Sequence, residues 1–187
     1  MSRIAIRNIV KDIVDLLKKE EEGRFDLPNS GDDYNFSNLS FPISVDLVLL
    51  KNNDIRKYKI ESHYVPYESI INLVIEYNKT NLVSNLYDLI GEINEIIAHE
   101  LEHARQDYFD EFEFDEFEFK GNNLDYYLQP HEILAQIKGF KRLSKLSGLP
   151  FFIVVRNWFN NHKEIHGLTP MEVEVVINKL LQKNGNL

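Results

Sequence analysis

The segment His99-Glu100-Leu101-Glu102-His103 limits the possible fold more than any other part of the chain. It has the pattern H-E-x-x-H, in which two histidines stand four positions apart. On an α-helix, side chains four positions apart lie on one face, so the two imidazoles can then aim at a single point. The pattern therefore predicts a helix that carries both imidazoles on the same side.

The residues around this motif favour the same helix. Apolar residues recur at spacings of three and four, which is typical of a helix with one buried face. No proline interrupts the stretch between Leu82 and Phe109, and Gly91 is its only glycine. We predict a helix over 82–109 with the apolar stripe Leu86, Leu89, Ile90, Ile93, Ile96, Ile97, Leu101 and Ala104.

Two imidazoles placed in this way make half of a tetrahedral zinc site. A catalytic zinc needs a third protein ligand and a fourth position that is left for water. Glu100 follows His99 directly, where its carboxylate can take a proton from a metal-bound water. The motif predicts Zn²⁺ bound by His99 and His103, with Glu100 as the general base.

The third ligand is expected on a second helix. A histidine six positions after His103 would complete one common pattern, but that position holds Phe109. The helix that is predicted to begin at Pro130 carries Glu132 in its first turn. We expect Glu132 to be the third ligand.

Ala135 and Gly139 lie three and seven positions after Glu132, so the three residues share one helical face. Small residues on that face let a neighbouring helix come close, and a carboxylate that reaches a metal on another helix needs this approach. Two alternatives stay open. Glu132 can serve only to stabilise the helix dipole, and the adjacent His131 can be the ligand in its place.

The rest of the chain predicts an α+β fold. A helix over 2–22 is followed by a loop over 23–42 that is rich in Gly, Asp, Asn, Ser and Pro. Alternating apolar residues predict strands over 44–51, 55–62 and 69–78, and the turn Asn52-Asn53-Asp54 joins the first two as a hairpin. Further helices are expected over 130–147, from Pro150, and from Thr169, where Thr169 and Glu172 can form a capping box.

These elements predict one domain over 1–187. We expect an N-terminal helix within 1–22, a small antiparallel sheet within 43–78, the metal helix at 82–109 and a mostly helical part over 130–183. The sheet is expected to pack on the metal helix.

A tandem acidic repeat follows the predicted metal helix. Asp110-Glu111-Phe112-Glu113-Phe114 recurs as Asp115-Glu116-Phe117-Glu118-Phe119. Because the repeat is five residues long, the faces of a regular strand would swap between the copies. We expect a flap near the site, or a docking element for a protein partner within 110–119, formed by Phe112, Phe114, Phe117 and Phe119.

Composition excludes several classes of function. The chain has no cysteine, which excludes disulfides, cysteine-bound zinc and a cysteine nucleophile. The formal charge of −9 argues against nucleic acid as a partner, because phosphate contacts need clustered Lys and Arg. The chain starts without an apolar run that could be a signal peptide or membrane span. We expect a cytoplasmic protein with no membrane partner.

With the H-E-L-E-H helix and the following Pro130-His131-Glu132-Ile133-Leu134-Ala135, the chain resembles the zincin metallopeptidases. It is most similar to the gluzincin-like group, in the compact form found in bacteria and their phages, over about half its length. The resemblance implies a zincin-like fold, a peptide or protein substrate, zinc held by His99, His103 and Glu132, and Glu100 as general base. It also implies that an edge strand, here 69–78, lies along the active-site groove and pairs with an extended peptide.

Two main functions remain open at this point, with a metal-free scaffold as a third possibility. The first is a zinc-dependent metallopeptidase, which also needs a donor to stabilise the oxyanion, with Tyr126, Tyr127 and His166 as candidates. The alternative is a catalytically silent zincin-like structural or interaction protein, such as a virion-associated component of a phage. The aromatic acidic segment 110–119 favours the second, and the spacing of the metal ligands does not separate them.

Overall fold

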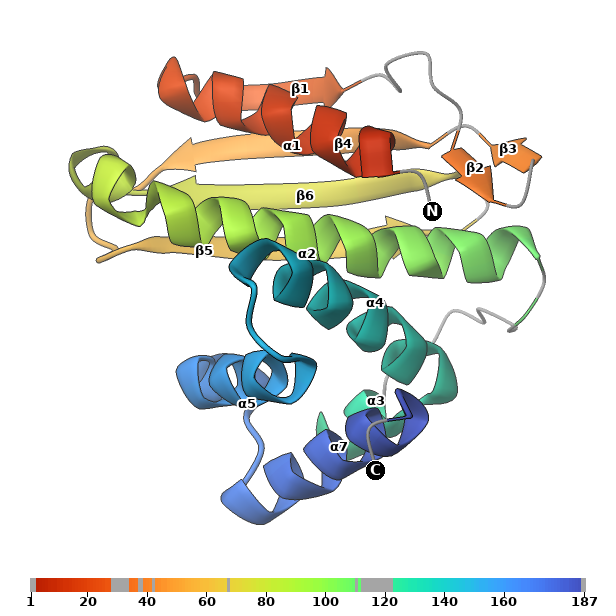
Figure 1. Ribbon diagram of the computed structural model, residues 1–187. Helices are drawn as coiled ribbons and strands as arrows, with labels where there is room; N and C mark the ends of the chain where they lie inside the picture. Colours follow the sequence, from red (N-terminus) through yellow and green to blue (C-terminus); the bar gives the residue numbers. More distant parts are fainter. Residues whose placement is uncertain are drawn as a thin grey trace.

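The computed structural model describes residues 3–27, 34–36, 39–41, 43–66, 68–109, 111 and 123–185. Over these residues the fold is α+β, with a four-stranded mixed sheet, two long helices on one of its faces and a mostly helical C-terminal half (Figure 1). This outcome confirms the predicted class.

Among the described helices, none combines the length and the apolar character that crossing a membrane requires.

The sheet has the strand order β1-β4-β6-β5. Its strands are β1 (Gly23–Leu27), β4 (Ser44–Lys51), β5 (Tyr58–Val65) and β6 (Ile70–Tyr77). β4 runs parallel to β6, whereas β1 and β5 run antiparallel to their neighbours. A separate two-stranded sheet pairs β2 (Tyr34–Phe36) with β3 (Leu39–Phe41).

Burial explains why β4 and β6 occupy the centre. Every second side chain of these strands points to the helices and is almost fully buried: Val45, Leu47, Leu49, Ile71, Leu73, Ile75 and Tyr77. β5 instead alternates half-buried residues with exposed ones. Burial of apolar side chains stabilises the fold most where neighbouring strands and helices cover them on all sides. The more polar strand β5 therefore lies at the edge.

Three predictions about the strands are wrong. Segments 44–51 and 55–62 do not form a hairpin, because β6 lies between β4 and β5. The sheet is consequently mixed and not antiparallel. The edge strand beside the predicted metal helix is β5, and the segment 69–78 that was expected at the edge is the central strand β6.

A side chain distant in the sequence accounts for the missing hairpin. The predicted turn begins as expected, since the Asp54 amide donates to Asn52 Oδ1 at 3.0 Å. The chain then crosses the end of β6, where the buried Asn78 side chain donates to the carbonyl oxygens of Asn53 and Ile55. These bonds place the 52–57 connection over β6.

The prediction of a loop over 23–42 is wrong for β1, β2 and β3. In β1, Phe25 and Leu27 pack against the core, and Arg24 pairs with Asp46 on β4. Only two inward apolar residues mark this strand, which is too few for a periodic signal. The remaining parts of 23–42, at 28–33, 37–38 and 42, lie outside the described residues.

Helices α1 (Arg3–Lys18) and α2 (Leu82–Tyr108) cover the same face of the sheet (Figure 1). α1 ends before the predicted boundary at residue 22, while α2, which follows the short 3-10 helix η1 (Lys79–Asn81), agrees with the predicted helix. The inner faces of α1, α2 and the sheet form one apolar core.

The C-terminal half contains α3 (Asn123–Leu128), α4 (Pro130–Ser147), α5 (Phe151–Asn161), α6 (Lys163–His166) and α7 (Pro170–Lys183). The predicted start of α4 at Pro130 and the capping box of Thr169 with Glu172 are confirmed. The short helices α3 and α6 were not predicted. A second apolar cluster around Phe140 and Phe159 packs α3, α4, α5 and α7 together.

α4 packs along α2 and joins the two halves (Figure 1). Ala135 is fully buried, and a Cβ atom at Gly139 would lie 2.5 Å from Glu95 Oε1 and 3.0 Å from the Glu95 carbonyl oxygen. Farther along, the Arg142 guanidinium donates twice to the buried Asn94 Oδ1, at 2.8 and 3.1 Å. The expected role of the small residues, which is to admit a neighbouring helix, is confirmed.

We predict that Gly139→Ala lowers the free energy of unfolding by about 1–3 kcal/mol, because its methyl group would overlap the Glu95 backbone and carboxylate. Gly91→Ala is the matched control, because Gly91 lies in the interior of α2 and faces α4, just as Gly139 lies in α4 and faces α2. A Cβ atom at Gly91 would make only an ordinary 3.4 Å contact with Leu143. The control should be neutral or gain up to about 1 kcal/mol from helix propensity. Urea unfolding measures both, and equal stability of the two variants would contradict the close packing.

Candidate metal centre

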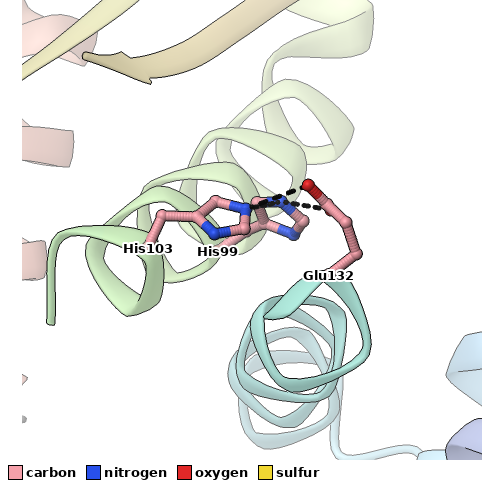
Figure 2. A group of neighbouring side chains, drawn as sticks. All are labelled: His99, His103 and Glu132. Carbon is pink, nitrogen blue, oxygen red and sulfur yellow. Dashed lines mark hydrogen bonds and ion pairs between the residues drawn. The ribbon is translucent and has the colours of Figure 1, made fainter. Parts of the chain in front are cut away.

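Three side chains from two helices meet at one point (Figure 2). His99 and His103 project from the same face of α2, and Glu132 reaches them from the first turn of α4. The two Nε2 atoms lie 3.0 Å apart. Glu132 Oε2 lies 3.5 Å from His99 Nε2, and Glu132 Oε1 lies 3.4 Å from His103 Nε2. This group could hold a metal ion.

These distances fit the edges of a coordination tetrahedron. Zinc bonds of about 2.0–2.2 Å at tetrahedral angles separate the ligand atoms by about 3.3–3.5 Å. Both contacts of Glu132 lie at that spacing, and the Nε2–Nε2 distance would need to open only slightly. Two nitrogens and one carboxylate also leave one coordination position for a further ligand.

The electrostatics of the group favour a positive charge at its centre. Burial opposes ionisation of Glu132, but the imidazoles of His103 and His99 outweigh it and hold the pKa of this carboxyl well below its usual range. Burial likewise opposes a proton on His99, yet Glu132, Glu100 and Glu95 raise its pKa to about 9. Glu132 Oε2 is buried without a hydrogen-bond partner among the described residues, as expected of a ligand atom.

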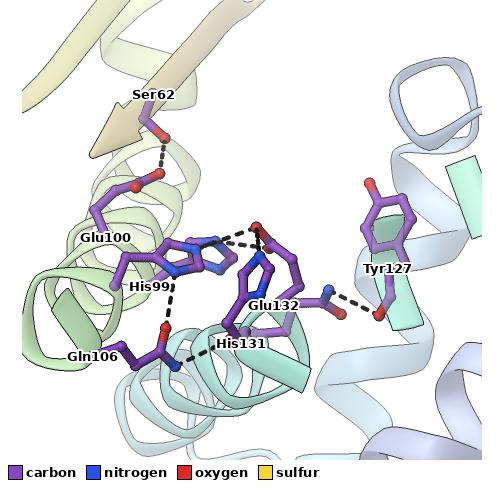
Figure 3. A network of polar contacts seen from close by, with 9 residues as sticks. Ser62, His99, Glu100, Gln106, Tyr127, His131 and Glu132 are labelled. Carbon is purple, nitrogen blue, oxygen red and sulfur yellow. Dashed lines mark hydrogen bonds and ion pairs between the residues drawn. The ribbon is translucent and has the colours of Figure 1, made fainter. Parts of the chain in front are cut away.

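Gln106 fixes the ring of His103. Its amide nitrogen donates to the backbone carbonyl of His131 at 3.2 Å (Figure 3). This bond turns its oxygen toward His103 Nδ1 at 3.1 Å. Nδ1 is then the protonated nitrogen, and Nε2 presents its lone pair to the metal position. This role was not predicted, although Gln106 stands three residues after His103 on the same helix.

Glu100, the expected general base, is buried on α2 beside the ligands. Ser62 on β5 donates its hydroxyl proton to Glu100 Oε1 at 2.7 Å (Figure 3). Thus Glu100 contacts the edge strand and is not a member of the ligand group. Ser62 was also missed, because no local pattern links a strand residue to a helix that begins twenty positions later.

His131, the alternative ligand, lies next to the group without joining it. Its Nε2 is 3.8 Å from Glu132 Oε1, and its ring centre is 5.8 Å from that of His103. Burial lowers the pKa of His131, which keeps the imidazole neutral. The structure therefore brings Glu132, and not His131, into the group that could hold a metal ion.

The three candidate oxyanion donors differ in their surroundings. Desolvation, followed by the charges of Glu132 and Glu100, raises the pKa of Tyr126 above its usual range. Tyr127 packs edge-on against Phe159, and desolvation, followed by Glu132, raises its pKa to about 12. Tyr126 is the candidate whose surroundings include the expected base.

His166 is engaged within the C-terminal half. Its Nδ1 accepts the Leu168 amide proton at 2.9 Å, and its Nε2 bonds to the Phe159 carbonyl oxygen at 2.8 Å. Both ring nitrogens are therefore occupied by backbone groups. This geometry argues against the expectation that His166 stabilises an oxyanion.

The expected flap or docking element lies outside the described residues. This applies to Phe112, Phe114, Phe117 and Phe119, and of the segment 110–119 only Glu111 is described. The guanidinium of Arg105 on α2 bonds both oxygens of Glu111. The prediction about the four phenylalanines stays a prediction.

Comparisons of the chain with models of protein families, with curated proteins and with solved structures give no significant match.

We predict that the protein binds one zinc ion and that Glu132→Gln weakens this binding by at least about tenfold, on the scale of a lost ligand contact. His131→Ala should change the affinity much less, because His131 lies outside the ligand group. The double variant His99→Ala/His103→Ala should bind no zinc. Metal analysis and chelator competition measure these effects, and a larger loss in His131→Ala than in Glu132→Gln would reverse the assignment.

We also predict that zinc affinity rises with pH up to about 9. Below the pKa of His99, which is raised to about 9, a proton occupies the nitrogen that must bind the metal. Each unit of pH below that value should therefore weaken binding by about tenfold if one proton is displaced. Competition with a chelator of known protonation between pH 6 and pH 9 tests this, and a constant affinity over that range would exclude a raised pKa.

Proposed function

We propose that this protein is a zinc-dependent peptide hydrolase. The observation that carries the proposal is the convergence of His99, His103 and Glu132 at tetrahedral distances, with Glu100 next to His99 on the same helix. Structural zinc sites use four protein ligands, whereas catalytic ones keep a position for water or substrate. Three protein ligands and a neighbouring carboxylate favour the catalytic type.

Zinc is the metal that best suits these ligands. Imidazole nitrogen and a single carboxylate oxygen are common zinc donors, while Mg²⁺ and Ca²⁺ prefer oxygen donors only. A zinc ion bound here would polarise a substrate carbonyl and lower the pKa of water toward neutrality. The cofactor of the proposed reaction is therefore Zn²⁺.

A gluzincin-like fold is part of the proposal. The features that support it are the H-E-x-x-H motif on α2, the sheet that packs on this helix and the glutamate that reaches back from the later helix α4. The edge strand also lies beside α2, as the resemblance implies, although this strand is β5. This sheet differs from the antiparallel sheet that the sequence predicted, because β4 and β6 run parallel.

We further propose that an extended peptide binds along the open edge of β5. The Asn78 amide bonds to the Lys57 carbonyl oxygen, which fixes the alternation of hydrogen-bonded pairs between β5 and β6. By this alternation the backbone groups of Ile60 and Ser62 point away from β6. Exposed N–H and C=O groups at a sheet edge pair readily with a further extended strand.

Glu100 supplies the acid–base chemistry in this proposal. Its carboxylate takes a proton from the attacking water and then delivers that proton to the departing amine nitrogen. Tyr126 is the donor that we assign to the oxyanion, because its raised pKa keeps the phenol neutral and the charges of Glu132 and Glu100 contribute to that shift. Together these groups account for both proton transfers and for the developing negative charge.

We predict that Glu100→Gln retains zinc and fold but loses at least about a hundredfold in peptide hydrolysis, the order expected for a missing general base. Glu92→Gln is the matched control, because Glu92 lies on the same helix and also accepts a hydrogen bond from β5, from Tyr58 at 2.8 Å. The control should keep its activity. The readouts are turnover of a diverse peptide library, zinc content and thermal stability.

Two results would count against the enzyme. If the zinc-loaded wild type hydrolyses no member of the library, the protein is better explained as a structural or interaction protein that keeps the metal site. If Glu100→Gln loses zinc or unfolds, Glu100 holds the site together and does not act as the base.

A further inference from the structure

We propose that Ser62 is a positioning residue that holds the Glu100 carboxylate in its working orientation. This inference rests on the proposed peptide hydrolysis and assigns to β5 a role beyond binding the substrate backbone. Ser62 does not touch the metal ligands and would act only through Glu100.

The contact between the two residues is short and well placed. Ser62 Oγ donates to Glu100 Oε1 at 2.7 Å, the length expected of a hydroxyl bonded to a carboxylate. Glu100 is only 5 % exposed. Within the described part of the chain, Ser62 is the only side chain that forms a hydrogen bond with this carboxylate. It is therefore the contact that selects one orientation of the glutamate.

A glutamate needs such a contact if it is to act as a base. Its side chain has three rotatable bonds, and its rotamer freedom must be lost before the carboxylate can face a water at the metal. A hydrogen bond at one carboxylate oxygen restricts these rotations. It leaves the other oxygen, Oε2, to receive the proton.

Ser62 is one of three side chains that bond β5 to α2. Tyr58 donates to Glu92 at 2.8 Å, Ser62 to Glu100 at 2.7 Å and Tyr64 to Asp107 at 2.7 Å. The outer two bonds fix the strand along the helix, whereas the central bond ends on the reacting group. The three bonds therefore hold β5 and the Glu100 carboxylate in a fixed position relative to each other.

The backbone of the same residue faces the open edge of β5 in the proposed substrate site. A peptide paired there would contact the Ser62 backbone while the Ser62 hydroxyl holds Glu100. One residue would thus set the distance between the bound peptide and the base. Substitution of the side chain leaves the backbone in place, so binding and orientation can be separated by experiment.

The test compares Ser62→Ala, Ser62→Thr and Tyr64→Phe as zinc-loaded full chains. Ser62→Ala should lower kcat by about tenfold to a hundredfold, the equivalent of one hydrogen bond to a charged group. Its KM should change by less than about threefold, because the backbone of the edge is intact. Ser62→Thr keeps the hydroxyl and should restore most of kcat.

Tyr64→Phe is the matched control. It removes an equally short bond between the same strand and helix, but this bond does not end on Glu100. Its kcat should stay close to that of the wild type. A wild-type kcat in Ser62→Ala, or an equal loss of kcat in Tyr64→Phe, would overturn the proposal, because the bond would then matter only for holding the strand or not at all.

A second measurement separates this inference from the proposed function. Crystal structures of the zinc-loaded wild type and of Ser62→Ala show the Glu100 rotamer directly, whether or not the protein cleaves peptides. We expect the carboxylate to leave its place in Ser62→Ala and to keep it in Ser62→Thr. An unmoved Glu100 in Ser62→Ala would refute the positioning role, while an inert wild type with a displaced Glu100 would refute only the hydrolase.

Discussion

The close approach of α4 to α2 is the constraint on which the candidate site depends. The histidines and Glu132 belong to different helices, so their ligand atoms meet only if the backbones come near each other. Gly139 permits this, because any larger residue would overlap Glu95. The bond of Arg142 to Asn94 and the ion pair of Lys138 with Glu102 hold the same pair of helices together on either side of that contact. Packing between helices therefore sets the geometry of the candidate metal ligands.

This interface buries an unusual concentration of acidic groups. Glu95, Glu100, Glu102 and Glu132 are each at most 6 % exposed. A buried carboxylate is costly unless a partner compensates it, and each has a different compensation. Glu102 pairs with Arg105 and Lys138, Glu100 accepts a hydrogen bond, and desolvation raises the pKa of Glu95 to about 7. Glu132 faces two imidazoles, and a divalent cation at that point would compensate its charge most fully.

The sheet contributes to the site through its edge. Because β4 and β6 carry the most deeply buried side chains, they occupy the centre. β5 is left beside α2, and no other described strand pairs with its outer side. The hydroxyls of Tyr58, Ser62 and Tyr64 then bond to three carboxylates of α2. Burial of apolar residues in the centre of the sheet thus decides which polar side chains meet the metal helix.

The sequence by itself determined the elements that depend on local spacing. The i, i+4 histidines and the apolar stripe define α2, Pro130 begins α4, and Thr169 with Glu172 caps α7. The local sequence also indicated Glu132 as a third ligand, but it left His131 open as the alternative. Only the tertiary structure decided that choice, the strand order, and the contacts of Ser62 and Gln106 with the site. Helix caps and periodicity are fixed by residues a few positions apart, whereas strand neighbours and ligand contacts depend on which distant side chains are buried together.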